Sequence, residues 1–228
     1  MLATAGRRLG DLLFGGSCFL CRGRARALLC DACDADLPRL TTALCPRCAL
    51  ASPSGAVCGR CLARPPAFDA TVAALEYRFP ADVLVQALKF RSELSLAAFF
   101  GKLLTAAARE PVDLVVPVPL FPRRLKERGF NQAMEIARHV ARATGARLDP
   151  RACERIVDTR AQFELPMEQR ERNVRGAFRC NGFLGGRVAV VDDVMTTGST
   201  LDEVARALKQ AGAERVVNWV IARTPPPA

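Results

Sequence analysis

The chain has 228 residues, enough for one ordinary domain and a small module, and half of its residues are hydrophobic. No apolar stretch reaches the length of a membrane span; Leu94 to Leu104, for example, is interrupted by Lys102. The N-terminal segment lacks a convincing signal-peptide cleavage site, so we expect a cytoplasmic protein without membrane insertion. The formal net charge of +10 makes nucleic acid a candidate partner.

Eight of the ten cysteines form four CxxC pairs. The pairs are Cys18/Cys21, Cys30/Cys33, Cys45/Cys48 and Cys58/Cys61. Two thiolates at this spacing can bind one tetrahedral ion, and two such pairs complete a structural four-cysteine zinc site. The pattern therefore predicts two Zn²⁺ ions rather than disulfides or a single redox motif. Bound as thiolates, these cysteines would lower the net charge to about +6.

Two pairings of these motifs are open. Sequential pairing leaves eight and nine residues between the two motifs of a site, whereas interleaved pairing leaves 23 and 24. We favour the sequential arrangement because short connections cost less loop entropy. This gives a double zinc ribbon over residues 1–65, whose metal ions would supply most of the folding free energy of the segment.

Pro65-Pro66 marks the predicted boundary to a second domain, residues 66–228. Its first elements are a strand over Ala70–Tyr77 and helices over Asp82–Phe90 and Leu94–Arg109. Five large apolar side chains lie on one face of the last helix, and this spacing favours a core position over a stacking platform for bases. They are Leu96, Phe99, Phe100, Leu103 and Leu104.

A buried strand is predicted over Asp113–Leu120, where the chain runs into prolines and then into a dense cationic segment. A rigid loop with several cations is what a diphosphate requires, although charge runs are more often solvated turns. The residues concerned are Pro119, Arg123, Arg124, Lys126, Arg128, Asn131 and Gln132. A helix over Asn131–Thr144 follows, with the single histidine, His139, expected at its surface.

The polar stretch Arg160–Phe178 is either a surface connection or a mobile loop that closes over a leaving group. Its candidate residues are Arg170, Arg172 and Asn173. The isolated cysteines Cys153 and Cys180 are expected to be small buried residues. Near the end of the chain, Arg215–Ala222 predicts a last strand with Trp219 in the core.

The segment Val188–Thr200 carries the most informative pattern. An apolar run, then Asp192 and Asp193, predicts a buried parallel strand that ends in two carboxylates, at the edge of the sheet where ligands bind. The Thr/Gly/Ser turn after it opens a helix and predicts a phosphate cradle. Carboxylates repel phosphate, so we expect them to meet sugar hydroxyls or a hydrated divalent cation. The alternative is a strand followed by an N-capped helix, but capping needs only one of these polar residues.

This segment resembles the 5-phosphoribosyl-1-pyrophosphate (PRPP) motif of the type I phosphoribosyltransferases at all thirteen positions. The resemblance implies that the two acids contact the ribose hydroxyls and that the loop wraps the 5-phosphate. The PRPP-binding residues that it implies are Asp192, Asp193, Met195, Thr196, Thr197, Gly198, Ser199 and Thr200.

Four features together resemble the ComF family, including its GntX-like proteins: the cysteine pairs, the strand leading to Arg128-Gly129-Phe130-Asn131-Gln132, the stretch before Ala177-Phe178, and the PRPP motif. The resemblance implies an α/β type I phosphoribosyltransferase fold, with a mostly parallel sheet flanked by helices, behind a small N-terminal double zinc ribbon. It also implies a link to DNA uptake in competence or to the use of imported DNA, with other competence proteins as candidate partners.

Two functional classes stay open. As an enzyme, the chain would displace diphosphate from PRPP with Mg²⁺, and no covalent nucleophile would be needed. The catalytic candidates are Asp192, Asp193, Arg128 and Arg170, and the diphosphate and loop candidates are Pro119, Arg124, Lys126, Arg128, Asn131, Gln132, Arg172 and Asn173. As a non-catalytic binding module, it would hold single-stranded DNA on basic surfaces, with the PRPP pocket as a sensor or a relic. The acceptor separates the two classes.

Overall fold

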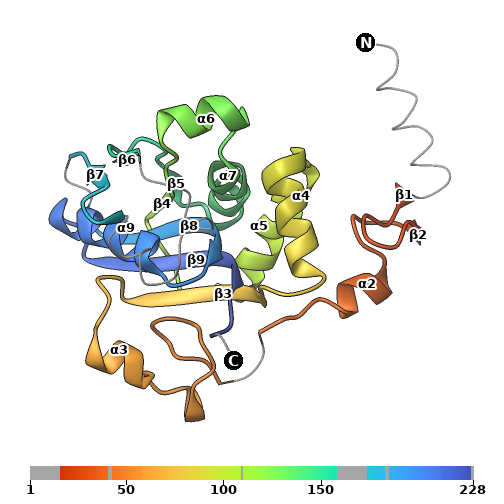
Figure 1. Ribbon diagram of the computed structural model, residues 1–228, viewed down its shortest axis with the longest axis horizontal. Helices are drawn as coiled ribbons and strands as arrows, with labels where there is room; N and C mark the ends of the chain where they lie inside the picture. The colour runs from red at the N-terminus through yellow and green to blue at the C-terminus, as the bar shows by residue number, and fades with distance from the viewer. Residues whose placement is uncertain (1–15, 41–42, 109, 159–173, 183–184, 227–228) are drawn as a thin grey trace.

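The computed structural model describes residues 16–40, 43–108, 110–158, 174–182 and 185–226. Five parallel strands form the central sheet, in the order β3-β9-β8-β4-β5 (Figure 1). The strands are β3 (Ala70–Glu76), β4 (Leu114–Pro117), β5 (Arg147–Leu148), β8 (Arg187–Met195) and β9 (Arg215–Arg223). The predicted α/β fold with a parallel sheet is confirmed, and β8 and β9 lie inside the sheet, where both have neighbours on each side.

Helices cover both faces of the sheet, and side chains that alternate along β8 separate the two layers. Val191 packs with α4 (Ala81–Arg91), α5 (Ser95–Ala107) and α7 (Gln132–Thr144), whereas Val190 packs with α9 (Ser199–Gln210). The predicted apolar face of α5 is core: Leu96, Phe100 and Leu104 are fully buried, and Phe99 and Leu103 are partly buried. Trp219 on β9 is buried as predicted.

Helices α5 and α7 approach closely at Gly101. A Cβ atom added there would lie 2.5 Å from the Cβ of His139 on α7. His139 is therefore half-buried at a helix contact, and its expected surface position is wrong. Spacing along one helix did not show which neighbour would cover it.

The basic segment after β4 differs from the predicted loop, because Pro122–Arg128 forms a short helix, α6. Pro122 at the first turn suits a helix start, and Gly129 ends the helix with φ +80°, a left-handed conformation that glycine adopts readily. A second difference concerns β8, which does not end at the two acids but continues to Met195, since Met195 still pairs with Arg223 of β9.

The two cysteines outside the CxxC pairs are not isolated. They face each other across the antiparallel pair β6 (Cys153–Arg155) and β7 (Phe178–Cys180), with Cα atoms 4.1 Å apart, and are joined as a disulfide. The prediction of small, separate residues is wrong because strand pairing brings together positions 27 residues apart in the sequence.

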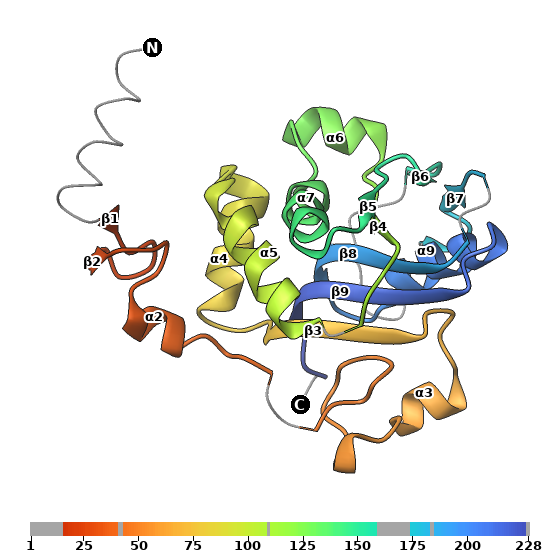
Figure 2. The ribbon, with the colours of Figure 1, turned by 180° about the vertical axis from the view of Figure 1, so that it is seen from behind.

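The first part of the cysteine-rich segment holds β1 (Gly16–Ser17), β2 (Arg24–Ala25) and α2 (Asp31–Ala35), and its second part holds the short helix η1 (Pro53–Gly55) and α3 (Gly59–Ala63). The second part lies beside the edge strand β3, whereas β1, β2 and α2 lie away from the sheet (Figures 1 and 2). Backbone hydrogen bonds from Leu40 N–H to Ala74, from Glu76 N–H to Pro38 and from Thr71 N–H to Pro46 cover the outer edge of β3. Covering an edge strand removes a site for unwanted pairing.

Within the described residues, none of the helices has both the length and the apolar character needed to cross a bilayer.

The close contact of α5 and α7 gives a stability prediction. Gly101→Ala should lower the free energy of unfolding by about 1–3 kcal/mol, although Ala favours helix, because the added methyl overpacks the contact with His139. Gly59→Ala is the control, since a Cβ at Gly59 meets nothing within 4 Å. Urea denaturation of the zinc-loaded proteins measures both, and an undiminished stability of Gly101→Ala would contradict the packing.

Candidate functional site

The two acids of β8 follow one another along the strand, and their carboxyl groups interact with each other. Asp193 is 3% exposed and turns toward α4, whereas Asp192 is half-buried. Each carboxylate also accepts a backbone hydrogen bond, Asp192 from the N–H of Asp193 and Asp193 from the N–H of Val194, both at 2.8 Å. The structure thus gives the two acids different surroundings.

Lys89 on α4 pairs with the buried acid: its Nζ lies 3.0 Å from Oδ2 of Asp193. Arg128 at the end of α6 lies near the two acids. Its guanidinium is 5.7 Å from the ring centre of Phe90, and its Nη1 donates a hydrogen bond to Oε1 of Gln132 at 2.7 Å. The pKa of Arg128 is lowered by burial, and the charges of Asp193 and Asp192 oppose this. Arg128 and Gln132 were predicted for this site, and Lys89 was not.

The pKa values of the acids diverge in consequence. Burial and the neighbouring charge of Asp193 raise the pKa of Asp192 to about 8. Burial acts on Asp193 as well, but the Lys89 ammonium holds the pKa of Asp193 below its usual range. The surroundings therefore favour the ionised form of Asp193 and the protonated form of Asp192.

Residues 196–200 comprise the turn after β8 and the first two residues of α9, and they are called the phosphate loop below. The N-cap position is Gly198, which has no side chain with which to cap α9, and of the turn's hydroxyl groups Thr197 Oγ1 accepts a hydrogen bond from the Ser199 N–H at 3.3 Å. Thr197 Oγ1 and Ser199 Oγ lie 2.8 Å apart. Asp192 and the loop line one shallow pocket at the N-terminus of the 12-residue helix α9. Backbone N–H groups and hydroxyls in this arrangement suit an anion.

Gly198 itself is required by the fold of the loop. Its φ is +89°, and a Cβ there would lie 2.7 Å from Cε of Met195. Met195 is buried beneath the turn and supports it from below. A larger residue at position 198 would therefore damage the loop before any ligand approached.

The other predicted residues fall into four groups. Asn131 caps α7 through Ala133 and Met134 and donates to the carbonyl of Val118, so its side chain is committed to the fold. Arg124 and Lys126 lie on α6 beside Arg123, which is exposed and held by Asp158 and Glu127 at 2.7 Å. Pro119 lines a separate groove with α6 and α7. Arg170, Arg172 and Asn173 lie outside the described residues.

Sequence reasoning missed three cations near the site. Lys89 follows Val85 by one helical turn on the apolar side of α4, and a lysine on that side was the available signal. Arg155 on β6 carries a pKa lowered by burial, and the charge of Asp192 partly offsets this; its sequence context gave no signal. Arg223 ends β9, is 2% exposed and donates hydrogen bonds to carbonyls near the phosphate loop. Burial lowers the pKa of Arg223 to about 10, so it stays charged at neutral pH.

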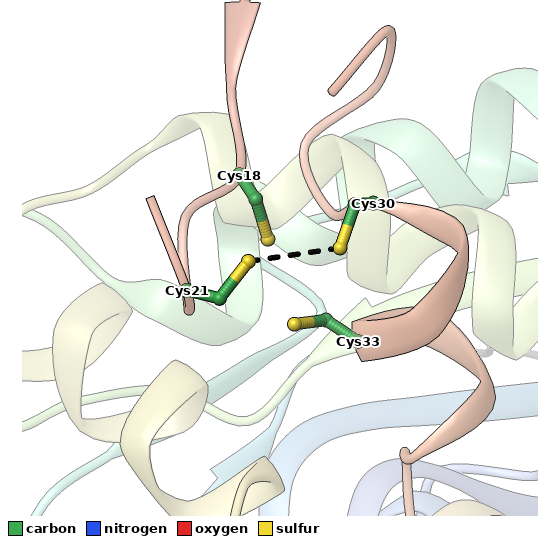
Figure 3. A group of neighbouring side chains, drawn as sticks. All are labelled: Cys18, Cys21, Cys30 and Cys33. Carbon is green, nitrogen blue, oxygen red and sulfur yellow. Dashed lines mark hydrogen bonds between the residues drawn. The ribbon is translucent and has the colours of Figure 1, made fainter. Parts of the chain in front are cut away.

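The eight CxxC cysteines form two clusters in the predicted sequential arrangement. The first cluster is Cys18, Cys21, Cys30 and Cys33, and the second is Cys45, Cys48, Cys58 and Cys61, with the sulfur atoms of each cluster within 4.8 Å of one another. Figure 3 shows the four sulfurs of the first cluster pointing toward a common centre, with Cys21 and Cys30 3.7 Å apart. Four converging sulfurs in paired motifs are the donor set of a structural zinc site.

The thiols of these clusters need a cation to ionise together. In the first cluster, burial opposes ionisation of Cys18, but backbone N–H groups of Cys21, Cys30 and Leu20 lower the pKa of that thiol to about 6. The hydrogen bond to Cys30 and burial raise the pKa of Cys33 to about 12. One thiol of the cluster loses its proton easily, and its negative charge then opposes deprotonation of the neighbouring thiols. A divalent cation at the centre would neutralise this charge and allow all four cysteines to bind as thiolates.

Two family models match separate parts of the chain. A family model described as "Double zinc ribbon domain" matches residues 9–62, and one described as "Phosphoribosyl transferase domain" matches residues 128–225. The chain is 36% identical over 222 residues to DNA utilization protein YhgH of Salmonella typhimurium, covering 92% of this chain and 97% of that protein.

Two further relatives carry competence names. Competence protein F of Haemophilus influenzae is 31% identical over 226 residues, covering 92% of this chain and 98% of that protein. Competence protein ComFC of Bacillus subtilis is 25% identical over 210 residues, covering 86% of this chain and 84% of that protein.

The clusters predict a zinc stoichiometry. The purified protein should contain two equivalents of zinc, measured by inductively coupled plasma mass spectrometry, because each cluster closes one four-cysteine site. The double variant Cys21→Ser with Cys33→Ser removes two ligands from the first cluster only and should retain one equivalent. Loss of both ions from that variant would instead indicate interleaved sites.

The raised pKa of Asp192 predicts a pH dependence of stability. The folded state holds this proton more tightly than the unfolded state, so the contribution to stability is complete below pH 4 and is lost as pH rises toward about 8. Between pH 6.5 and 8.5, Asp192→Asn should therefore flatten the fall in the free energy of unfolding, measured by urea denaturation. Glu93→Gln, at an exposed position, is the control. An equal slope in wild type and Asp192→Asn would contradict the assignment.

Proposed function

The chain belongs to the ComF family, and from that membership and the geometry at the end of β8 we propose that it binds PRPP with Mg²⁺ and transfers the phosphoribosyl group. One observation carries the proposal: a half-buried carboxylate, Asp192, shares a pocket with the phosphate loop at the N-terminus of α9. This places an acceptor for sugar hydroxyls beside donors for a phosphate. A ribose 5-phosphate carries both kinds of group.

The neighbouring residues would divide the remaining work. Asp192 would accept hydrogen bonds from ribose hydroxyls, which favours its ionised form and so releases a proton on binding. Asp193 is committed to Lys89 and would hold the end of β8 in place rather than contact the ligand. Arg128, at the end of α6 and held by Gln132, would neutralise the diphosphate. Mg²⁺, when bound, would neutralise charge on the diphosphate oxygens as they leave.

The transfer of the phosphoribosyl group requires no covalent nucleophile on the protein. Displacement at C1 of the ribose passes through an oxocarbenium-like state, so the protein must orient the sugar and stabilise the departing charge. The names of the relatives supply the biological context: two are competence proteins and one is a DNA utilization protein. We propose by that analogy that the activity serves uptake or use of DNA, with the acceptor still to be identified.

The division between the two acids predicts different mutant phenotypes. Asp192→Asn should weaken binding of PRPP with Mg²⁺ by about ten- to hundredfold, because a hydrogen bond to a charged group is worth about 1.5–3 kcal/mol. Glu93→Gln should bind like wild type in the same isothermal titrations. Asp193→Asn should instead lower stability, since it leaves Lys89 buried without its partner. A folded Asp192→Asn protein with unchanged affinity would remove the basis of the proposal.

Turnover is tested by release of diphosphate. The assay contains PRPP, Mg²⁺ and, in turn, bases, nucleotides and single-stranded DNA. Release that depends on one acceptor class and is lost in Asp192→Asn identifies a transferase. Tight PRPP binding without release for any acceptor would favour a sensing role over catalysis.

The second candidate function is binding of single-stranded DNA, and the basic helix α6 favours it. Four cations fall within its seven residues, although Arg123 is already paired with Asp158 and Glu127. Lys126 is exposed, and Arg128 lies beside the acids of β8. DNA phosphates and the diphosphate of PRPP would thus bind to some of the same Lys and Arg side chains.

This overlap predicts competition. DNA affinity should fall steeply with salt, and saturating PRPP with Mg²⁺ should weaken it further. Lys126→Gln should reduce the slope of log K against log salt by about 1, whereas Lys102→Gln, on α5, should leave it unchanged. Fluorescence anisotropy with a labelled single strand measures these slopes. A DNA affinity that changes neither with salt nor with PRPP would exclude a shared binding surface.

A further inference from the structure

Arg223 connects the second cysteine cluster to the phosphate loop. Its Nε donates to the carbonyl of Cys48 at 2.8 Å, and its Nη1 donates to the carbonyls of Met195 at 2.8 Å and of Thr196. Nη1 also donates to the carbonyl of Thr224 at 2.8 Å. One buried guanidinium therefore bonds both to a metal-ligand residue and to the residues at which the phosphate loop begins.

The segment that carries the second cysteine cluster, Cys45 to Cys61, is called the second ribbon, and the segment that carries the first cluster, Cys18 to Cys33, is called the first ribbon. Other contacts place the second ribbon against the phosphate loop. Arg47, between the ligands Cys45 and Cys48, donates from Nη1 to the carbonyl of Phe68 at 3.3 Å. The Phe68 ring lies 3.8 Å from the position that a Cβ would take on Gly198. The neighbouring Ala67 N–H donates to Oδ1 of Asp202 in the first turn of α9. The second ribbon thus forms part of the support for the loop and for the helix that follows it.

The first ribbon meets the sheet elsewhere. Its connection bonds to the outer edge of β3, from Leu40 N–H to the carbonyl of Ala74 and from Glu76 N–H to the carbonyl of Pro38. The two ribbons therefore provide an internal comparison. If metal binding affects the loop through Arg223, the second cluster should have the effect and the first should have a much smaller one.

The charge of Arg223 explains why metal at the second cluster would matter. The four hydrogen bonds that Arg223 makes to described residues all end on carbonyl oxygens, so no carboxylate there balances its charge. Four thiolates on one Zn²⁺ carry a net charge of −2 and would lie next to the guanidinium. Without the metal, that charge is lost and the Cys45–Cys48 turn, which presents the Cys48 carbonyl, is released. A buried cation then loses both a bond and its counter-charge.

We propose that Arg223 is a positioning residue through which zinc in the second cysteine cluster sets the conformation of the phosphate loop. Zinc at this cluster and an anion in the loop then strengthen each other's binding, because coupling between two sites is reciprocal. The anion is PRPP if the proposed function holds, and in that respect the inference rests on it. The coupling itself is a property of the ribbon, the arginine and the loop.

Hydrogen–deuterium exchange of peptides spanning residues 194–201 tests the coupling without any ligand. Exchange should rise about tenfold in Arg223→Gln and in Cys58→Ser, which removes a ligand from the second cluster. Arg223→Lys keeps the charge with a different donor geometry and should be intermediate, which guards against misfolding of the first variant. Arg215→Gln, at the other end of β9 where Arg215 pairs with Glu110, should not change loop exchange. Unchanged loop exchange in Cys58→Ser or in folded Arg223 variants overturns the inference.

Zinc release to a chromogenic chelator provides the reciprocal test. In wild type, saturating PRPP with Mg²⁺ should slow the release of one of the two ions, and this protection should disappear in Arg223→Gln, be reduced in Arg223→Lys and persist in Arg215→Gln. If wild type binds PRPP by calorimetry yet releases both ions at unchanged rates, the coupling fails and the proposed function stands. If wild type does not bind PRPP, the proposed function fails, and the exchange measurements still decide the coupling.

Discussion

The buried ion pair between Asp193 and Lys89 is the interaction on which the site depends. A carboxylate inside a parallel sheet is tolerated only with a cation in contact, and Lys89 Nζ lies 3.0 Å from it. Breaking such a pair typically costs about 3–5 kcal/mol, so α4 is tied to the end of β8. The pair also fixes the negative charge that, with burial, raises the pKa of the neighbouring Asp192. Two adjacent acids of one motif thereby become a structural anchor and a ligand-facing group.

The ribbons belong to the architecture of the sheet as much as to a separate module. Parallel sheets are covered on both faces by helices, which leaves their edge strands to be protected by other means. Here the connection after α2 and Pro46 of the second ribbon hydrogen-bond to the outer edge of β3, and Cys45, Cys48 and Cys61 share a hydrophobic cluster with Phe68, Met195 and Leu201. This cluster links the metal-binding cysteines to Met195 and Leu201, which flank the phosphate loop.

Much of this could be predicted from local sequence patterns. The four CxxC pairs indicated the two clusters, the lower loop entropy of short connections favoured their sequential arrangement, and Val188–Thr200 indicated a strand, a loop and a helix in the order observed. These patterns succeed because the residues that act together are close in the sequence. The α6 helix was not predicted because the segment was interpreted from its positive charges alone. Pro122 at its start and Gly129 at its end are helix-boundary signals that are present in the sequence.

Contacts between distant residues could not be predicted in this way. Arg223 reaches Cys48 over 175 positions, and Lys89 meets Asp193 from a different layer of the fold. Cys153 and Cys180 are paired only because β6 and β7 are. Asn131 matches the family motif, and in the structure its side chain caps α7. A motif gives the residue types of a site, and the fold decides which of them are available to a ligand.

A crystal structure of the protein with PRPP and Mg²⁺ tests the central claim most directly. The account predicts the 5-phosphate in the phosphate loop at the N-terminus of α9, the ribose hydroxyls on Asp192, and Asp193 still paired with Lys89. The diphosphate should extend toward Arg128. A phosphate bound on α6 away from the loop, or a ribose contacted by Asp193 with Lys89 displaced, would contradict it.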